Sequence, residues 1–305
     1  MTKCLLFFCC FFLGFSASAQ LQKKAASPDA RVQIPFELTA YNNILIPVIL
    51  NGRDTVKLMF HTAADAVNLT EEATKRVKLD FQRTDSVKSW GGDQNTSRFS
   101  PVNTVQLGTM VFENVPIWED TNSGQGSDGK FGINLFEGKT IQIDFEHKEL
   151  VLRDNLPSDI ETYSKQRLIQ ENGYLFIHAL ATIDSKILIN KYLIHSGYAG
   201  AVLLDDVFVE KFGIADKLTV INQKELKDSF GNVLKTQRAI LPQFRIGNIL
   251  LEEVPVGFFS GALSRQKMSV VGGDILKRFQ MVLDAKREFI YLKSNALIND
   301  IYKGV

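Results

Sequence analysis

The amino-acid sequence predicts an all-β protein built from two homologous lobes. Most apolar segments are short, rich in Val, Ile and Phe, and separated by Gly, Asn and Asp, a pattern typical of β-strands joined by turns. The chain also repeats its own motifs once, in the same order. In each copy, an apolar run ends in a short polar triplet that begins with histidine.

The expected strands of the first lobe are short apolar or alternating runs that end at turn residues. They are Ile34–Leu38, Ile44–Leu50, Val56–Phe60, Val102–Leu107, Val111–Trp118, Ile141–Phe145 and Leu150–Leu152. Two short helices are expected at Thr70–Val77 and Asp205–Phe212. Thr70 and Asp205 are suitable N-cap residues, and acidic residues follow both of them.

The internal repeat is carried by three pairs of motifs. Leu107-Gly108 corresponds to Ile246-Gly247, an offset of 139 (247 − 108), and Gly132–Phe136 corresponds to Gly272–Leu276, an offset of 140 (272 − 132). Ser89-Trp90-Gly91 corresponds to Ser229-Phe230-Gly231, again with an offset of 140 (230 − 90). We therefore expect lobes at residues 34–152 and 173–305, joined by a linker at 153–172.

The first 19 residues have the pattern of an export signal. Lys3 precedes the apolar run Cys4–Phe15, and Ala17-Ser18-Ala19 offers a cleavage site. We expect an exported protein, periplasmic or extracellular, or surface-associated if Cys9 or Cys10 carries a lipid. Residues 20–33 are then a flexible lead-in. All cysteines lie inside this signal, so no disulfide and no cysteine ligand is expected in the mature chain.

Charge and hydropathy limit the classes of partner. The formal net charge is +1, which gives no reason to expect nucleic acid or an anionic membrane surface. No other segment has the length and apolar character of a membrane-spanning helix, so no integral membrane span is expected. The oligomeric state is not indicated by any pattern.

The two histidine triplets are candidate site residues. His195-Ser196-Gly197 follows the apolar run at 192–194, and His61-Thr62-Ala63 follows the run at 58–60. With the glycine-bearing motifs and the stretch Val270–Leu276, these triplets resemble the pepsin/retropepsin superfamily of aspartic proteases. The resemblance implies a bilobal acid-protease fold with a central cleft, in which both triplets meet and an extended ligand binds. It also implies that Trp90-Gly91 and Phe230-Gly231 form flaps that contact substrate.

The sequence departs from that family where catalytic aspartates are expected. His61 and His195 occupy those positions, Thr62 and Ser196 keep the hydroxyl, and only Gly197 keeps the glycine. Two imidazoles do not share one proton as two close carboxylates do, so ordinary aspartic endopeptidase activity is not expected. The leading hypothesis is a protein that binds a peptide or another extended polymer in the cleft.

Alternatives stay open at this point. His61 and His195 could act as an acid–base pair in a hydrolase or lyase that acts on a peptide or glycan. They could bind zinc if Asp65 or Asp205 supplied a third ligand, but no spacing requires it and no cofactor is expected. The cleft could also be a vestigial one in a protein–protein interaction module.

The remaining ionisable residues are expected to be structural. His147 is expected in a solvated hairpin turn, and His178 in the core or an interface. Asp144, Asp274 and Asp284 resemble structural aspartates at strand ends and turns, away from the cleft.

Overall fold

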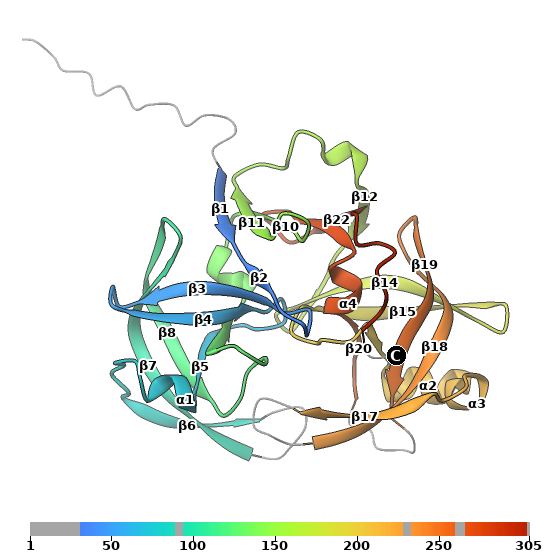
Figure 1. Cartoon of the computed structure of the whole chain (residues 1–305), viewed down its shortest axis with the longest axis horizontal. Helices are drawn as coiled ribbons and strands as arrows, with labels where there is room; N and C mark the ends of the chain where they lie inside the picture. Colours follow the sequence, from blue (N-terminus) through green and yellow to red (C-terminus); the bar gives the residue numbers. More distant parts are fainter. Residues whose placement is uncertain (1–30, 89–93, 228–232, 260–265, 304–305) are drawn as a thin grey trace, which may run out of the picture. The chain divides into compact units, whose positions relative to one another are not determined.

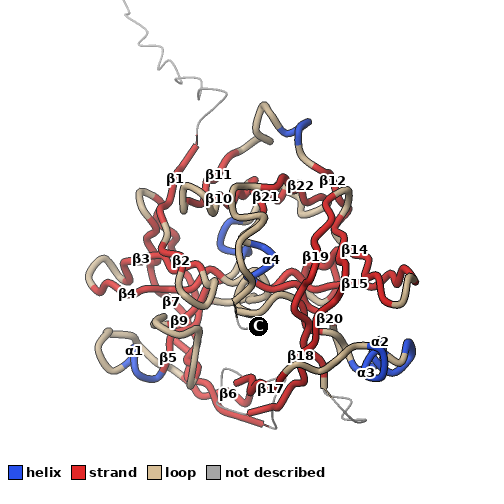
Figure 2. Tube along the Cα trace, turned by 45° about the vertical axis from the view of Figure 1, so that its right-hand side comes forward, coloured by secondary structure: helices blue, strands red, loops and turns tan. Residues whose placement is uncertain are grey.

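The computed structural model describes residues 31–88, 94–227, 233–259 and 266–303. From Arg31 onward the chain forms one compact unit. The expected signal peptide lies outside the described residues, as do the flap residues Trp90, Gly91, Phe230 and Gly231. Strands dominate the described chain and the helices are short, which confirms the predicted all-β class (Figures 1 and 2).

The first lobe is an eight-stranded sheet that also pairs β3 with β7. Its order is β2-β3-β4-β9-β5-β8-β7-β6. Their bounds are β2 Glu37–Leu38, β3 Ile44–Leu50, β4 Asp54–Phe60, β5 Val67–Thr70, β6 Arg83–Lys88, β7 Gln94–Leu107, β8 Met110–Asp120 and β9 Gly129–Phe131. The β3–β4 hairpin turns at Asn51 and Gly52, both at positive φ as a tight hairpin turn requires.

The second lobe repeats this arrangement, again with eight strands. Its order is β13-β14-β15-β20-β16-β19-β18-β17, and β14 also pairs with β18. The bounds are β13 Ile169–Glu171, β14 Tyr174–Ile183, β15 Lys186–His195, β16 Val202–Leu203, β17 Asn222–Lys227, β18 Val233–Ile246, β19 Ile249–Phe258 and β20 Ser269–Gly272. The two sheets therefore match strand for strand, as the sequence repeat predicts.

A third, six-stranded sheet takes strands from both halves of the chain, in the order β1-β11-β10-β21-β22-β12 (Figure 2). The bounds are β1 Arg31–Pro35, β10 Thr140–Asp144, β11 Glu149–Arg153, β12 Ser164–Arg167, β21 Phe279–Leu283 and β22 Phe289–Ser294. At its centre β10 pairs antiparallel with β21, and Gln142 is opposite Val282. The range expected as a linker, 153–172, thus contains β12 and β13, and β1 begins inside the expected lead-in.

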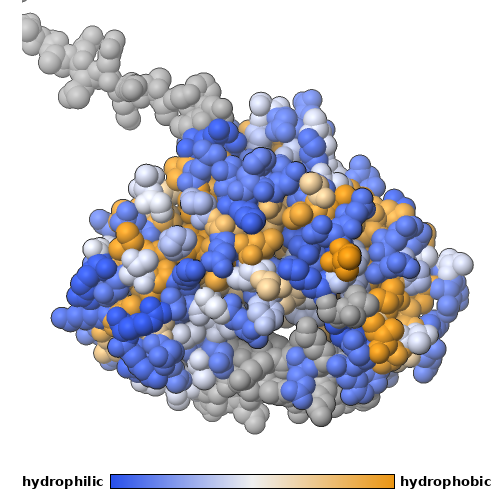
Figure 3. Space-filling model, viewed as in Figure 1, coloured by the Kyte–Doolittle hydropathy of each residue, from blue (hydrophilic) through white to orange (hydrophobic). Residues whose placement is uncertain are grey.

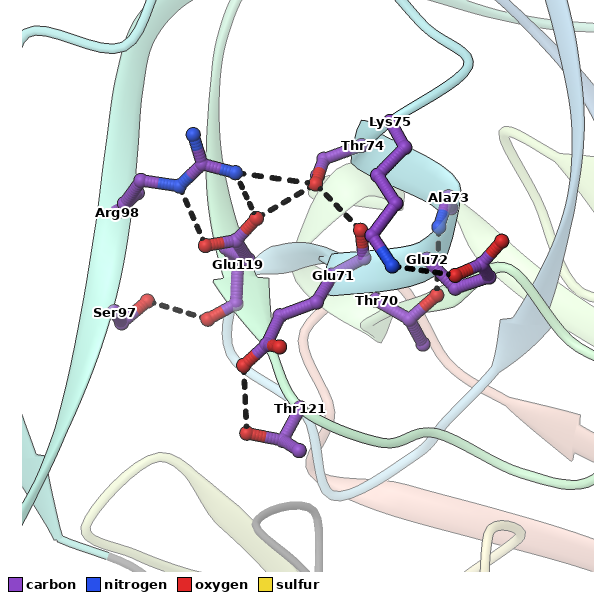
Figure 4. Close-up of polar contacts among 10 residues, drawn as sticks. All are labelled: Thr70, Glu71, Glu72, Ala73, Thr74, Lys75, Ser97, Arg98, Glu119 and Thr121. Atoms are coloured by element: carbon purple, nitrogen blue, oxygen red, sulfur yellow. Dashed lines mark hydrogen bonds and ion pairs between the residues drawn. The ribbon is translucent and has the colours of Figure 1, made fainter.

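The helices are α1 Glu71–Thr74, α2 Asp206–Phe212, α3 Ile214–Lys217 and α4 Gly273–Leu276, with 3-10 turns at Ile133–Phe136 and Ile160–Thr162. Asp205 caps α2 as predicted, because its carboxylate accepts the N–H of Phe208 at 2.8 Å. The helix expected at Thr70–Val77 is wrong in length. It ends at Thr74, whose hydroxyl bonds back to the carbonyl of Glu71 and to the carboxylate of Glu119 (Figure 4).

The core of each lobe consists of the inward-facing positions of the strands. One large cluster of buried apolar side chains runs through both lobes, from Ile34 to Leu292. The face seen in Figure 3 is largely hydrophilic, with apolar groups in scattered places. Among the described residues, no helix is long and apolar enough to cross a membrane.

Candidate functional site

The two histidine triplets begin where β4 and β15 end. Each of these strands runs parallel to a short strand, β4 to β9 and β15 to β20. The backbone N–H of His61 donates to the carbonyl of Phe131 at 2.9 Å, and His195 is in register with Gly272. Each histidine therefore lies at the C-terminal end of a strand that is paired in parallel with a short strand, at equivalent positions in the two lobes.

Thr62 and Ser196 join the two triplets. The N–H of Thr62 donates to the hydroxyl of Ser196, and the N–H of Ser196 donates to the hydroxyl of Thr62, each at 3.0 Å. The hydroxyls then donate to buried strand carbonyls, Thr62 to Ile194 at 2.7 Å and Ser196 to Phe60 at 2.8 Å. Both side chains are about 1% exposed, and every polar atom in this exchange has a partner.

This exchange holds His61 and His195 against each other. Their ring centroids are 4.5 Å apart, and the ring planes make an angle of 58°. Nδ1 of His61 accepts the N–H of Ala63 at 3.1 Å, so the proton of the neutral ring is on Nε2. Nδ1 of His195 is buried and has no hydrogen-bond partner among the described residues. A Cβ at Gly197 would overlap the Cδ2–Nε2 edge of His61, so only glycine fits there.

The surroundings keep both imidazoles neutral. Burial lowers the pKa of His61 well below 6.5, and the charges of His195 and Lys130 lower it further. Burial also lowers the pKa of His195, to about 4, with a further contribution from Lys130. At neutral pH the pair therefore consists of two uncharged rings: the lone pair of His61 is engaged by Ala63, whereas Nδ1 of His195 has no partner among the described residues.

Lys130 is a site residue that was not predicted. It lies on β9, opposite Met59 of β4, and its ammonium is 2.6 Å from the carboxylate of Asp120. The ion pair is largely buried, with side-chain exposures of 16% and 8%. The sequence contained a signal for Lys130, because this lysine stands between Gly129 and Phe131 in a short strand. Lysine is seldom buried in a strand unless it has a partner.

Asparagines of the first lobe hold the loop of the second triplet. Asn43 donates its amide to the carbonyl of Ser196 at 3.1 Å, and Asn42 donates to the carbonyl of Ala199 at 3.0 Å. Both side chains are buried. The site is thus fixed by hydrogen bonds between the lobes as well as within them.

The other candidates lie elsewhere. His147 is an exposed turn residue whose Nδ1 is 2.9 Å from the carboxylate of Asp144, in agreement with its expected place. The expectation for His178 is wrong, because it faces solvent on β14, opposite Lys191. Asp274 is fully buried and paired with Lys277 at 2.8 Å, a structural role. Asp284 accepts the N–H of Phe289 at 2.9 Å next to the β21–β22 turn.

The described residues do not form a metal site. They contain no cluster of three or more His, Asp or Glu side chains that could hold a metal ion. Asp65 is exposed, and the carboxylate of Asp205 is engaged by Asn190, Ser269 and the N–H of Phe208. Two imidazoles alone are fewer than the ligands zinc ordinarily takes from protein.

Comparisons with known proteins agree with this geometry. Residues 46–135 match the family model described as aspartyl protease, a range inside the first lobe. No curated protein matches the chain. Among solved structures, the chain is similar to the aspartic proteinase from Irpex lacteus. The TM-score is 0.60 and the identity 14%, over 89% of this chain and 99% of the other.

The fold and the paired triplets define a bilobal protein of the pepsin-like class. The aspartyl protease family model matches residues 46–135 of the first lobe, and the fold of both lobes is similar to that of an aspartic proteinase, in agreement with the resemblance seen in the sequence.

Proposed function

We propose that the chain is an exported, aspartic-protease-like protein that binds a peptide or another extended polymer between its lobes, without the acid chemistry of an aspartic dyad. The observation that carries the proposal is the pair of neutral imidazoles, His61 and His195, in contact where the two triplets meet. Export rests on the signal-like residues 1–19.

The geometry argues against ordinary proteolysis. That reaction needs two close carboxyl groups sharing one proton, one to activate water and one to protonate the substrate. The groups that meet at this site are imidazoles, and Asp120, the acid paired with Lys130, is held by that ammonium at 2.6 Å. No carboxyl pair is therefore available at the joined triplets.

The charge state also argues against an acid–base pair of histidines. Such a pair needs one protonated ring at the working pH. Burial and the Lys130 charge lower the pKa of both rings, so neither is protonated near pH 7. The pair offers a base but no acid, which favours binding over turnover.

A combined assay of cleavage and binding tests the proposal. We expect no cleavage of fluorescein-labelled casein between pH 3 and pH 8, with or without a pepstatin-type inhibitor. We expect that labelled peptides bind with affinities that His195→Ala changes only modestly. Cleavage abolished by His61→Ala or His195→Ala in folded protein would contradict the proposal, and so would the absence of peptide binding.

Export has its own test. Expression of the full chain with its native first residues is expected to yield a processed protein outside the cytoplasm. The N-terminus found by mass spectrometry is expected to be Gln20. An unprocessed chain retained in the cytoplasm would contradict this part of the proposal.

A further inference from the structure

The two lobes place different side chains on the sheet faces that carry His61 and His195. Side chains at paired positions of neighbouring strands lie on the same face of a sheet, and residues two apart on a strand share a face. In the first lobe, the row on the face of His61 crosses five strands, through Phe99, Trp118, Asn68, Lys130 and Met59. In the second lobe, the row on the face of His195 runs through Arg238, Gly257, Leu203, Val270 and Leu193.

The two lobes carry an aromatic ring at different positions near these rows. Trp118 of the first lobe corresponds to Gly257, and Ala64 corresponds to Tyr198, which follows the His195 triplet directly. A Cβ at Gly257 would lie 3.6 Å from the Tyr198 hydroxyl, an ordinary contact distance, so this hydroxyl lies directly against the glycine. In the first lobe, Trp118 occupies the corresponding position, and its ring packs against that of Phe99 at an angle of 43°, with ring centroids 4.4 Å apart.

Arg238 is opposite Gly257 in the register of β18 and β19, and the Tyr198 hydroxyl lies against the same glycine. Arg238 is 8% exposed, and no ion pair or hydrogen bond joins its guanidinium to another described residue. Its charge acts on the phenol: burial raises the pKa of Tyr198 to about 12, and Arg238 opposes that rise. A largely buried arginine without a described counterion offers a position that an anion can stabilise, since buried charges are ordinarily paired.

The same face of the second lobe is otherwise apolar. Leu193, Leu203, Val270 and Phe176 form a small buried cluster separate from the main core. Tyr198 and Ala63 pack against it, which places the cluster next to both triplets. The row beside Arg238 is therefore apolar, and Arg238 and the Tyr198 hydroxyl are the polar groups next to it.

We propose that Arg238 and the Tyr198 hydroxyl form a carboxylate-binding subsite, and that the ligand is a peptide with an acidic side chain flanked by apolar ones. The guanidinium donates hydrogen bonds to the carboxylate, and the phenol donates one more. This inference rests on the proposed function, because it specifies which peptides the site binds.

A peptide fits these observations better than an acidic glycan. Sugar rings present hydroxyl groups that need many polar partners, whereas the row next to Arg238 consists of Gly257, Leu203 and Val270. An unpartnered hydroxyl on this surface costs free energy, and an apolar peptide side chain gains it.

Two labelled peptides test the subsite. One is a fluorescein-labelled heptapeptide with a central glutamate between leucine and phenylalanine; its twin carries glutamine instead. Fluorescence anisotropy at pH 7 measures both against the purified protein. We expect the glutamate peptide to bind about tenfold tighter or more, the effect of a hydrogen-bonded charge.

Three variants assign that preference to its residues. Arg238→Gln is expected to bring the affinity for the glutamate peptide down to that of the glutamine peptide, which itself stays unchanged. Tyr198→Phe keeps the ring and is expected to lose part of the preference. Arg245→Gln is the matched control, because Arg245 is on the same strand seven positions away and on the opposite face. It is expected to bind like the wild type.

Each of the following outcomes would contradict the inference. Equal affinity of the wild type for both peptides would remove the subsite and leave the proposed function intact, and this comparison needs no variant to fold. Equal weakening of both peptides by Arg238→Gln would make the residue structural. Tighter, Arg238-dependent binding of trigalacturonate would show that the ligand is a glycan. Failure of both peptides to bind would overturn this inference and the proposed function together.

Discussion

Thr62 and Ser196 exchange hydrogen bonds across the two lobes, each N–H donating to the other's hydroxyl at 3.0 Å. Each hydroxyl also donates to a carbonyl of the other lobe, Thr62 to Ile194 in β15 and Ser196 to Phe60 in β4. Removal of either oxygen therefore leaves buried groups unpaired. We expect Thr62→Val and Ser196→Ala each to lower the free energy of unfolding by about 1–3 kcal/mol. Urea unfolding measures it.

The double variant gives a sharper result. Because these bonds hold the two triplets against each other, loss of one hydroxyl already weakens the positioning of the other, and the double variant is expected to cost less than the sum of the single costs. Strict additivity would show that the hydroxyls act independently. Ser158→Ala, at an exposed serine in a turn, is a control for the substitution itself and is expected to cost less than about 0.5 kcal/mol.

The neutral histidines predict a loss of stability in mild acid. In the unfolded chain both rings titrate near pH 6.5, whereas in the folded protein their pKa values are lower, about 4 for His195. Below pH 6.5 the unfolded state therefore binds protons that the folded state does not. The free energy of unfolding is expected to fall by roughly 1.4 kcal/mol per pH unit for each ring, down through the folded pKa.

Chemical unfolding at pH 7, 6 and 5 measures this slope. The variant with both His61→Gln and His195→Gln is expected to lose it. His147→Gln is the control, because Asp144 raises the pKa of that exposed ring and its effect has the opposite sign. Equal stability of the wild type at pH 7 and pH 5 would contradict the prediction.

Gly197 is expected to tolerate no side chain while His61 is present. A Cβ at this position would overlap the imidazole edge and would also come within 3.3 Å of Cε1 of His195. Gly197→Ala is expected to cost about 1–3 kcal/mol through overpacking. In combination with His61→Ala, which vacates the space, the same change is expected to cost far less. Equal costs in both backgrounds would place the strain elsewhere.

The network at α1 predicts a stability effect away from the site (Figure 4). Glu119 accepts hydrogen bonds from the guanidinium of Arg98 and from the hydroxyl of Thr74, and its side chain is 9% exposed. Glu119→Gln is expected to cost about 1–3 kcal/mol, because it removes the counterion of Arg98. Thermal and urea unfolding measure it.

An exposed pair on the same helix provides the control. Lys75 and Glu72 are 2.8 Å apart, but their side chains are 70% and 80% exposed. Glu72→Gln is expected to change stability by less than about 0.5 kcal/mol. A similar cost for Glu72→Gln and Glu119→Gln would show that burial does not strengthen the network.

Local patterns predicted a large part of this fold. The continuous apolar run Ile44–Leu50 marked β3 with both of its bounds, and the repeated motifs indicated two matching lobes before any pairing was known. The triplets were recognisable because His61 and His195 recur with their hydroxyl neighbours. Their contact followed from the family resemblance, and the structure places them together.

Pairings between distant residues were not predictable in the same way. Lys130 meets Asp120 because β5 lies between β9 and β8, and no sequence pattern specifies that order. Tyr198 lies above Gly257 for the same kind of reason. His178 was expected in the core because its strand is apolar, but the alternation of β14 turns it outward. β12 escaped notice because a polar strand of four residues looks like a linker.

The six-stranded sheet bears on the evolutionary origin of the chain and on the behaviour of its two halves when they are separated. Its central pair is symmetric: Ile141 faces Leu283, Gln142 faces Val282 and Ile143 faces Met281, so the two halves relate like the subunits of a twofold dimer. A chain cut between β11 and β12 would expose β10 as a bare edge that a second copy of the same half could complete. Gene duplication and fusion of a homodimer would produce this sheet, and separation of the halves would return each of them to self-association.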